Sequence, residues 1–146
     1  MKCRLIAAGT RLPEWVNAGF ETYRKRLRKP LLLELHEIPV SNAAKEGAAM
    51  LAALGRDDYV VALAIEGKCM DTAALSAWLE RRLLEGRSLA LLVGGPDGLA
   101  RQCLQRADQQ WSLSPLTLPH ALVRVIIAEQ LYRAISLQAG HPYHRA

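Results

Sequence analysis

The last residues of the chain hold a dense cluster of groups that could take part in chemistry. His141, Tyr143, His144 and Arg145 place two imidazoles, a phenol and a guanidinium within five positions. Such groups can accept a proton, orient a reacting base or stabilise a negative charge. A chain terminus is usually disordered and chemically plain, so a frayed end with a chance cluster is the alternative. Composition alone leaves both interpretations open.

A second candidate is a glycine-rich turn, residues 94–98, which follows the apolar run at residues 89–93. If that run is a buried parallel strand, the turn lies at its carboxyl end, where α/β proteins bind ligands. Adjacent glycines let a ligand approach the backbone closely. The spacing of Gly94, Gly95 and Gly98 matches neither GxGxxG nor the P-loop signature, which argues against a P-loop kinase or ATPase. A plain strand-to-helix connection is the alternative.

The segment from Leu113 to Pro119 is a third candidate. Its prolines, Pro115 and Pro119, impose an extended and poorly paired backbone. The amides and carbonyls of such a segment need hydrogen-bond partners, which are either water or a ligand. An adenine ring suits this site, because backbone groups can match its polar edge while the leucines of the segment cover its faces.

Length and composition bound the class of protein. The chain has 146 residues, of which 51% are hydrophobic, so we expect one domain over residues 1–146 with an ordinary core. No apolar run approaches the about 20 residues that a membrane span requires. The start of the chain shows no signal-peptide pattern.

Cysteine and histidine usage favours a reducing compartment and no metal. Cys3, Cys69 and Cys103 are far apart and form no CxxC pair, which argues against a disulfide framework and a zinc ribbon. We therefore expect a cytoplasmic protein. The histidines of the C-terminal part have no cysteine or carboxylate beside them, so we expect no metal site.

The positive charge of the chain is concentrated in one segment. The formal net charge is +5, and residues 24–29 (Arg-Lys-Arg-Leu-Arg-Lys) place five cations in six positions. A field of this kind attracts polyanions, nucleic acid above all. The alternative is a solvated helix end whose cations complement the helix dipole.

Hydrophobic periodicity predicts strands that alternate with helices. The expected strands are residues 2–8, 31–38, 59–65, 89–93 and a short one near 111–113. The expected helices are residues 13–28, 43–54, a third from its cap at Asp71 or Thr72 to Gly86, a short one at 99–107, and 121–137. This alternation predicts an α/β fold with a mainly parallel sheet flanked by helices and right-handed crossovers.

The final helix is apolar in nearly every direction, so it must be buried on several sides. One side can face the sheet, and a second copy of the chain is the simplest cover for the other, which predicts a homodimer through this helix. A deep core helix in a monomer is the alternative. We expect His120 to cap the helix, Glu129 and Arg133 to pair at i,i+4 spacing, and Arg124 to reach a phosphate or a carboxylate across the dimer.

Several blocks of the sequence resemble the RlmH family, small methyltransferases of the SPOUT class, and the resemblance runs from end to end. The blocks are Ala8–Thr10, Pro13–Val16, Leu92–Gly98, Trp111–Ser114, Leu116–His120, Leu122–Val125, Glu129–Ala134 and His141–Arg145. The segment after Pro39 departs from the family pattern, because it lacks part of a loop that is usually rich in Gly and Lys.

The resemblance implies a fold and an activity that the periodicity does not show. The C-terminal half would form an α/β knot of the SPOUT trefoil type, and the knot loops would bind S-adenosyl-L-methionine. The protein would be a homodimer through the final helix. It would methylate N3 of a pseudouridine in helix 69 of 23S ribosomal RNA, free or in the assembled ribosome. A non-catalytic RNA- or ribosome-binding module, or an enzyme acting on a small nucleotide, are the competing interpretations.

The resemblance also implies roles for particular residues. The cofactor-binding residues would be Leu63, Gly94, Leu113, Ser114, Pro115, Leu116, Thr117 and Leu118. The catalytic residues would be Tyr143, His144 and Arg145. We expect Arg145 to stabilise the negative charge that develops on the acceptor, and His144 or Tyr143 to orient the base or to accept its proton. The tail would complete the site of the partner subunit.

Overall fold

The computed structural model describes residues 1–145, apart from the side chain of His144. The strands are β1 (Lys2–Ala8), β2 (Leu32–Ile38), β3 (Tyr59–Cys69), β4 (Leu89–Val93) and β5 (Gln109–Ser112). The helices are α1 (Glu14–Arg26), α2 (Ala43–Ala53), α3 (Thr72–Glu85), α4 (Arg101–Arg106), α5 (His120–Gln138) and a final 3-10 turn, η1 (Pro142–His144).

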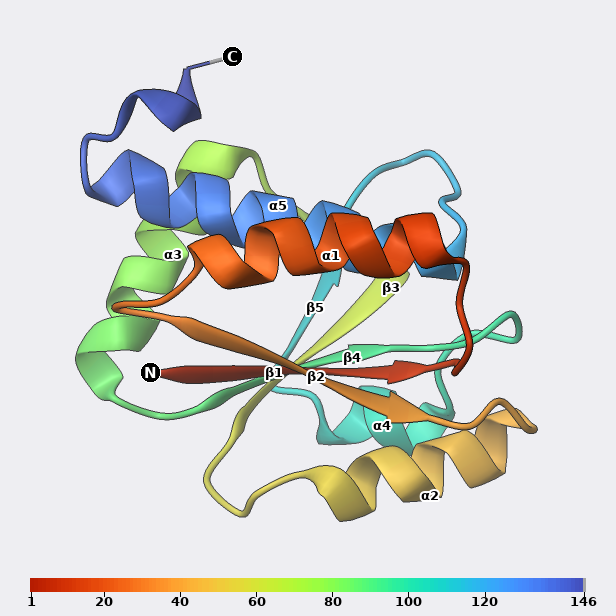
Figure 1. Cartoon of the computed structure of the whole chain (residues 1–146). Helices are drawn as coiled ribbons and strands as arrows, with labels where there is room; N and C mark the ends of the chain where they lie inside the picture. The colour runs from red at the N-terminus through yellow and green to blue at the C-terminus, as the bar shows by residue number, and fades with distance from the viewer. Residues whose placement is uncertain (146) are drawn as a thin grey trace.

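The strands form one sheet in the order β2-β1-β4-β3-β5, and every neighbouring pair is parallel. Helices α1, α3 and α5 cover one face of the sheet, and α2 and α4 cover the other (Figure 1). The predicted α/β architecture with a mainly parallel sheet is therefore confirmed. All the carboxyl ends of the strands meet at one edge, which is where the candidate loops lie.

The core consists of two layers that the strands separate by simple alternation. On β1, Leu5 and Ala7 belong to the hydrophobic cluster under α1, α3 and α5, whereas Ile6 and Ala8 belong to the cluster under α2 and α4. Successive side chains of a strand point to opposite faces. Every residue of β4 is buried, as expected for a central strand that is covered on both sides.

The helix ends follow from capping chemistry, with one correction. Asp71 caps α3, and Gly86 ends it in the left-handed conformation with φ of 73°. The prediction that His120 caps α5 is wrong. Pro119 is the cap residue, and its carbonyl oxygen accepts a hydrogen bond from Val123 N–H (3.1 Å), so His120 is the first helical residue.

Strand β3 is longer than predicted and contains an irregularity. Both Leu63 and Lys68 pair with Trp111 of β5, so residues 64–67 form an excursion between two stretches of regular pairing. A Cβ on Gly67 would lie 2.5 Å from the carbonyl carbon of Trp111, so the approach of this excursion to β5 requires glycine. The pairing also starts β5 at Gln109, before the predicted residue 111.

Helix α5 lies between α1 and α3 on the sheet, which confirms that it is buried on several sides (Figure 1). Its residues Ile127, Ala128, Leu131 and Ala134 are fully buried in the larger cluster. Gly19 of α1 faces Val125 so closely that a Cβ there would lie 3.3 Å from the valine side chain. No helix within the described residues is long and apolar enough to cross a membrane.

Arg124 corrects a prediction. The side chain is 1% exposed, and its Nη1 lies 2.6 Å from the Glu37 carboxylate in the same chain. Its Nη2 donates to the carbonyl oxygen of Gly9 (2.7 Å), while its Nε lacks a partner within the described residues. Arg124 therefore ties the start of α5 to the carboxyl ends of β1 and β2, and it does not reach toward a phosphate or a second chain.

Candidate functional site

A cavity of about 500 Å³ opens at the carboxyl ends of β3, β4 and β5. Its walls come from three regions that are distant in the sequence: Leu63 with the β3 excursion, the glycine turn after β4 with Leu99 and Leu104, and the segment that runs from β5 through its loop into the first turn of α5. Parallel pairing brings these segments to one edge of the sheet. The cavity therefore lies where open α/β sheets bind their ligands.

The structure brings most of the predicted cofactor residues together. Those that line the cavity are Leu63, Gly94, Leu113, Ser114, Leu116, Thr117 and Leu118. Pro115 is exposed and is not among the residues that line the cavity. The Ser114 hydroxyl accepts a hydrogen bond from Leu116 N–H (2.9 Å), which closes a tight local turn with Pro115 between the two partners.

The glycine turn is built by a close contact of backbone with backbone. A Cβ on Gly94 would lie 2.5 Å from the carbonyl carbon of Gly98, so only glycine fits at position 94. Gly98 has φ of 76°, and its N–H donates to the Gly95 carbonyl oxygen at 2.9 Å. The turn folds on itself, and it presents the backbone of its glycines and the ring of Pro96 to the cavity.

The rest of the lining is mainly apolar, with few polar groups. Among the described residues that line the cavity, Glu66 is the only carboxylate and His120 the only imidazole. Leu116 is 74% exposed at this site. An exposed leucine beside a cavity offers apolar surface that a flat ligand can cover.

Sequence reasoning found Leu63 but missed the rest of the cavity wall that β3 provides. Ala64, Ile65 and Glu66 lie on the β3 excursion, which the predicted strand of residues 59–65 treated as regular or left out. The available signal was Gly67, because an isolated glycine in a strand pattern often marks a bulge. His120 and Val123 of α5 also line the cavity, and their helical spacing alone gave no reason to place them there.

The C-terminal tail lies on its own chain through an aromatic and cationic cluster. The ring centroids of Tyr143 and Tyr132 are 4.6 Å apart. The guanidinium carbons of Arg133 and Arg26 lie 5.0 and 6.0 Å from the centroid of the Tyr143 ring. Burial and a hydrogen bond with Tyr23 raise the pKa of Tyr143 to about 12. The phenol is therefore protonated at neutral pH.

The other tail residues differ in their surroundings. His141 accepts a hydrogen bond on Nδ1 from Tyr143 N–H (3.2 Å) and so caps η1. The Arg145 side chain is exposed. The imidazole of His144 lies outside the described residues. Glu129 and Arg133 form the predicted ion pair at 2.7 Å, which raises the pKa of Arg133.

The cavity and the tail lie at opposite ends of α5. His120 and Val123 line the cavity, whereas the tail follows Gln138. A helix of 19 residues separates them by about 28 Å at about 1.5 Å per residue. The structure therefore does not bring the predicted catalytic residues to the predicted cofactor residues within one chain.

Other reactive groups do not gather at this site. All three cysteines are free, and burial raises the pKa of Cys3 to about 12. The described residues contain no group of three or more histidines, cysteines or acids that could hold a metal ion.

The open parallel sheet with its looped carboxyl edge belongs to a known class. A family model described as Predicted SPOUT methyltransferase matches residues 1–144, and the chain belongs to this family. Two solved structures share the fold. A probable methyltransferase from Bordetella pertussis Tohama I has a TM-score of 0.59 at 14% identity over 91% of this chain and 95% of that one. A probable methylase family protein from Haemophilus influenzae Rd KW20 has a TM-score of 0.56 at 10% identity over 99% and 70%.

Within that family the chain is similar to proteins named Ribosomal RNA large subunit methyltransferase H. The one from Alkalilimnicola ehrlichii is 54% identical over 156 residues, covering 100% of both chains. The one from Hahella chejuensis is 51% identical over 155 residues, covering 99% of both. These alignments are longer than the 146 residues of this chain, which agrees with a shortened segment. The structure joins β2 to α2 through residues 39–42 alone.

Proposed function

We propose that this protein is an S-adenosyl-L-methionine-dependent methyltransferase acting on N3 of a pseudouridine in helix 69 of 23S ribosomal RNA. The observation that carries the proposal is full-length similarity to ribosomal RNA large subunit methyltransferases H, together with a ligand-sized cavity at the carboxyl edge of the sheet. Residues 1–146 act as one knotted catalytic domain. The site of action is the cytoplasm, where ribosomal RNA is available.

The cavity fits S-adenosyl-L-methionine in size and in chemistry. A volume of about 500 Å³ is within the range of small-molecule sites. Leu113, Leu116 and Leu118 offer apolar cover for an adenine ring, and the Gly94 turn offers bare backbone. The bound cofactor supplies a methyl group on a positively charged sulfur, which is already a good leaving group. The protein therefore mainly has to position the acceptor.

The catalytic tail acts in the cavity of a second copy of the chain. Within one copy the length of α5 keeps the tail from the cavity. A homodimer through α5 brings the tail of each copy to the cavity of the other. Leu122, Ile126 and Leu137 of α5 remain partly exposed in the single chain, and Trp15 of the neighbouring α1 is 63% exposed. A dimer would cover this apolar surface.

The proposed roles in the tail follow from charge and protonation. An imide nitrogen is protonated near neutral pH, so transfer requires removal of that proton and stabilisation of the anion. The exposed Arg145 guanidinium is permanently cationic and stabilises the developing charge. Tyr143 stays protonated because its pKa is about 12, so it positions the base or donates a hydrogen bond. His144 is then the candidate proton acceptor.

Calorimetry with S-adenosyl-L-methionine is the first test. We expect one binding site per chain. A non-catalytic RNA-binding module would show no affinity for the cofactor, and an enzyme for small nucleotides would bind it without transferring methyl to RNA. Arg145→Ala should then lower methyl transfer by about 100-fold at unchanged cofactor affinity. Transfer at a near wild-type rate in this variant would make the assignment of Arg145 wrong.

Mixed dimers test whether the tail acts across the dimer. Arg145→Ala keeps an intact cavity, and Gly94→Val keeps an intact tail but fills the cavity. Random mixing of two inactive proteins should restore about a quarter of the wild-type activity if the tail acts on the partner, because half of the dimers then hold one complete site. No recovery in dimers that have demonstrably exchanged would exclude action across the dimer.

A further inference from the structure

The carboxyl end of α1 carries cations that have no anionic partner. This basic end consists of Arg24, Lys25, Arg26, Arg28 and Lys29. Arg24 forms an ion pair with Glu21 at 2.7 Å. Lys25, Arg28 and Lys29 are exposed and form no ion pair within the described residues.

The helix dipole explains only part of this charge. Cations in the last turn of a helix are stabilised by the dipole, and Arg24, Lys25 and Arg26 are in that position. The dipole effect falls off beyond the last turn. Arg28 and Lys29 lie past the end of the helix, since α1 closes with Leu27 as its extended C-cap. Their charge therefore needs another explanation.

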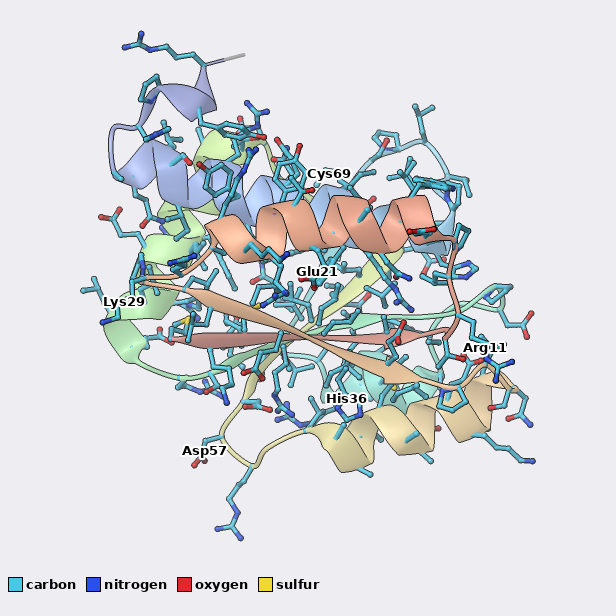
Figure 2. The ribbon with its side chains drawn as sticks, in the orientation of Figure 1. Arg11, Glu21, Lys29, His36, Asp57 and Cys69 are labelled. Carbon is cyan, nitrogen blue, oxygen red and sulfur yellow. The ribbon has the colours of Figure 1, made fainter. Side chains whose placement is uncertain are left out.

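The basic end of α1 is in contact with the C-terminal tail. The guanidinium carbon of Arg26 lies 5.6, 5.7 and 6.0 Å from the ring centroids of Tyr23, Tyr132 and Tyr143. Lys29 lies at the end of α1 on the side of the molecule where the chain terminates, far from Arg11 at the other end of the helix (Figure 2). Arg26 therefore joins the carboxyl end of α1 to Tyr143, two residues before the exposed Arg145.

The nearby acidic groups do not cancel this charge. Glu129 pairs with Arg133 at 2.7 Å, and Glu34 lies 3.5 Å from Lys2. The N-terminal ammonium of Met1 donates to the Pro30 carbonyl oxygen at 2.9 Å and adds a further positive charge beside Lys29. The surface thus holds a local excess of positive charge over the last turn of α1 and the residues that follow it.

We propose that the basic end of α1 binds the phosphate backbone of the RNA whose base is methylated, through Lys25, Arg28 and Lys29. This inference rests on the proposed function and adds to it the part of the chain that holds the RNA. Phosphate contacts from exposed cations fix the register of a nucleic acid, and the reacting base is then presented separately. Because Arg26 joins this surface to Tyr143, the copy that donates the tail also holds the RNA, while its partner holds the cofactor.

Two triple variants with the same net charge test the proposal. Lys25→Gln, Arg28→Gln and Lys29→Gln remove three cations from the basic end of α1. The matched control, Lys45→Gln, Arg56→Gln and Arg101→Gln, removes three exposed cations from the α2 and α4 side of the sheet. Binding of a labelled large-subunit ribosomal RNA transcript is measured over a series of salt concentrations, and circular dichroism with thermal melting confirms that each protein is folded.

We expect the α1 variant to bind the RNA at least about tenfold more weakly. The slope of log Kd against log salt concentration should be smaller than that of the wild type by roughly two to three. The control should change affinity less than about threefold and its slope by less than about one. A charge-retaining variant, Lys25→Arg, Arg28→Lys and Lys29→Arg, should keep the wild-type slope, because phosphates respond to charge. Equal losses in the α1 and control variants, or no loss in the α1 variant, would overturn the proposal.

The outcomes separate this inference from the proposed function. If the α1 variant loses RNA affinity but the wild-type protein binds no S-adenosyl-L-methionine, the RNA surface stands and the methyltransferase proposal fails. If the wild-type protein transfers methyl and the α1 variant keeps the wild-type salt slope, the RNA surface alone is wrong. In mixed dimers, the α1 changes should lower activity more when placed on the Gly94→Val copy, which donates the tail, than on the Arg145→Ala copy.

Discussion

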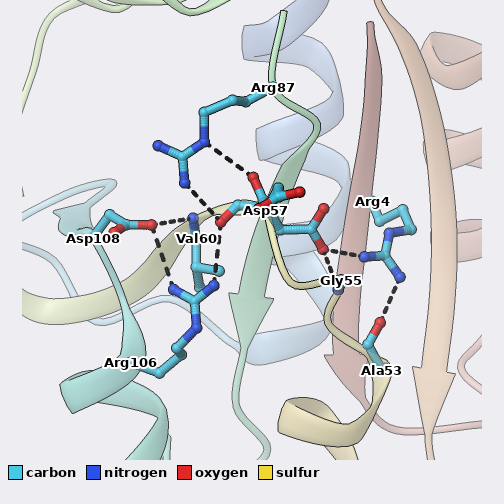
Figure 3. Close-up of polar contacts among 9 residues, drawn as sticks. Arg4, Ala53, Gly55, Asp57, Val60, Arg87, Arg106 and Asp108 are labelled. Carbon is cyan, nitrogen blue, oxygen red and sulfur yellow. Dashed lines mark hydrogen bonds and ion pairs between the residues drawn. The ribbon is translucent and has the colours of Figure 1, made fainter.

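The two edges of the sheet are built in opposite ways. At the amino edge, Arg4 forms a salt bridge with the buried Asp58 carboxylate, and the Asp58 carbonyl oxygen accepts from Arg87 and Arg106 at 3.2 Å each (Figure 3). At the carboxyl edge, glycine turns and apolar side chains leave a cavity of about 500 Å³. One edge joins its polar groups to each other, and the other leaves room for a ligand.

The amino edge stabilises the sheet, and the carboxyl edge holds the candidate site. The amino-edge groups come from segments before β3, β4 and β5, so the network ties the beginnings of these strands together. The carboxyl edge is free to carry irregular backbone because the strands are held elsewhere. We therefore expect changes at the amino edge to alter the free energy of unfolding, and changes at the carboxyl edge to alter ligand affinity.

Loss of the Asp58 carboxylate would break the amino edge most severely. Asp58→Ala leaves the partly buried Arg4 guanidinium without its carboxylate partner, with only the Ala53 carbonyl oxygen as acceptor, and it leaves Gly55 N–H without its acceptor, which lies at 2.7 Å. We expect the free energy of unfolding to fall by about 3–5 kcal/mol in urea denaturation. The exposed neighbour Asp57 is the matched control, and Asp57→Ala should change the free energy by less than about 0.5 kcal/mol. A change below about 1 kcal/mol in Asp58→Ala would contradict the structural role of the network.

The second largest effect is expected for Gly94→Ala, which should lower the affinity of the carboxyl edge for its cofactor. The added Cβ would lie 2.5 Å from the Gly98 carbonyl carbon and would force the turn to move. Affinity for S-adenosyl-L-methionine should fall by about 10- to 100-fold, as measured by calorimetry.

Gly47 of α2 provides a control with a similar clash between two residues that do not line the cavity. A Cβ on Gly47 would lie 2.6 Å from the Ala100 Cβ. Gly47→Ala should therefore lower stability without lowering the cofactor affinity of the folded protein. If both variants lost affinity equally, the effect at Gly94 would be one of general stability and not of the site.

A smaller effect is expected for Leu116→Ala. The side chain is 74% exposed beside the cavity, so its removal costs little in the free chain. A bound adenine would cover it, so cofactor affinity should fall by about fivefold, with the free energy of unfolding unchanged within about 0.5 kcal/mol. Leu84 of α3, 85% exposed, is the matched control, and its change to alanine should leave affinity unchanged. Unaltered cofactor affinity in Leu116→Ala would mean that the adenine does not contact this part of the loop.

The smallest expected effect concerns the titration of the tail. The pKa of Tyr143 is raised from 10.0 to about 12, so folding favours the neutral phenol. Its contribution to stability is fully present below about pH 10 and is lost as the pH rises through about 12. Spectrophotometric titration of the wild type and Tyr143→Phe should show a difference that titrates near pH 12. A difference centred near pH 10 would mean that the tail leaves the cluster in solution.

Much of the fold could be predicted from the chain because its signals are local. β4 is uniformly apolar and is the central buried strand, and Asp71 and Gly86 delimit α3 as capping chemistry requires. The site was predicted less completely. The glycine turn and the loop after β5 were found from their residue types, whereas the β3 excursion depends on how β3 and β5 pair around Gly67. Arg124 was misassigned because nothing near it in the sequence indicates Glu37 as its partner.

Local residue patterns are enough to predict the alternation of strands and helices, the apolar character of α5 and the two backbone-rich loops, because each depends on residues within about one element. Three relations come from long-range packing instead: these loops share a cavity, the tail lies at the other end of α5, and the basic end of α1 adjoins the tail. These relations depend on the strand order β2-β1-β4-β3-β5 and on helix packing. Both are contacts between residues far apart in the chain, and no local pattern specifies them.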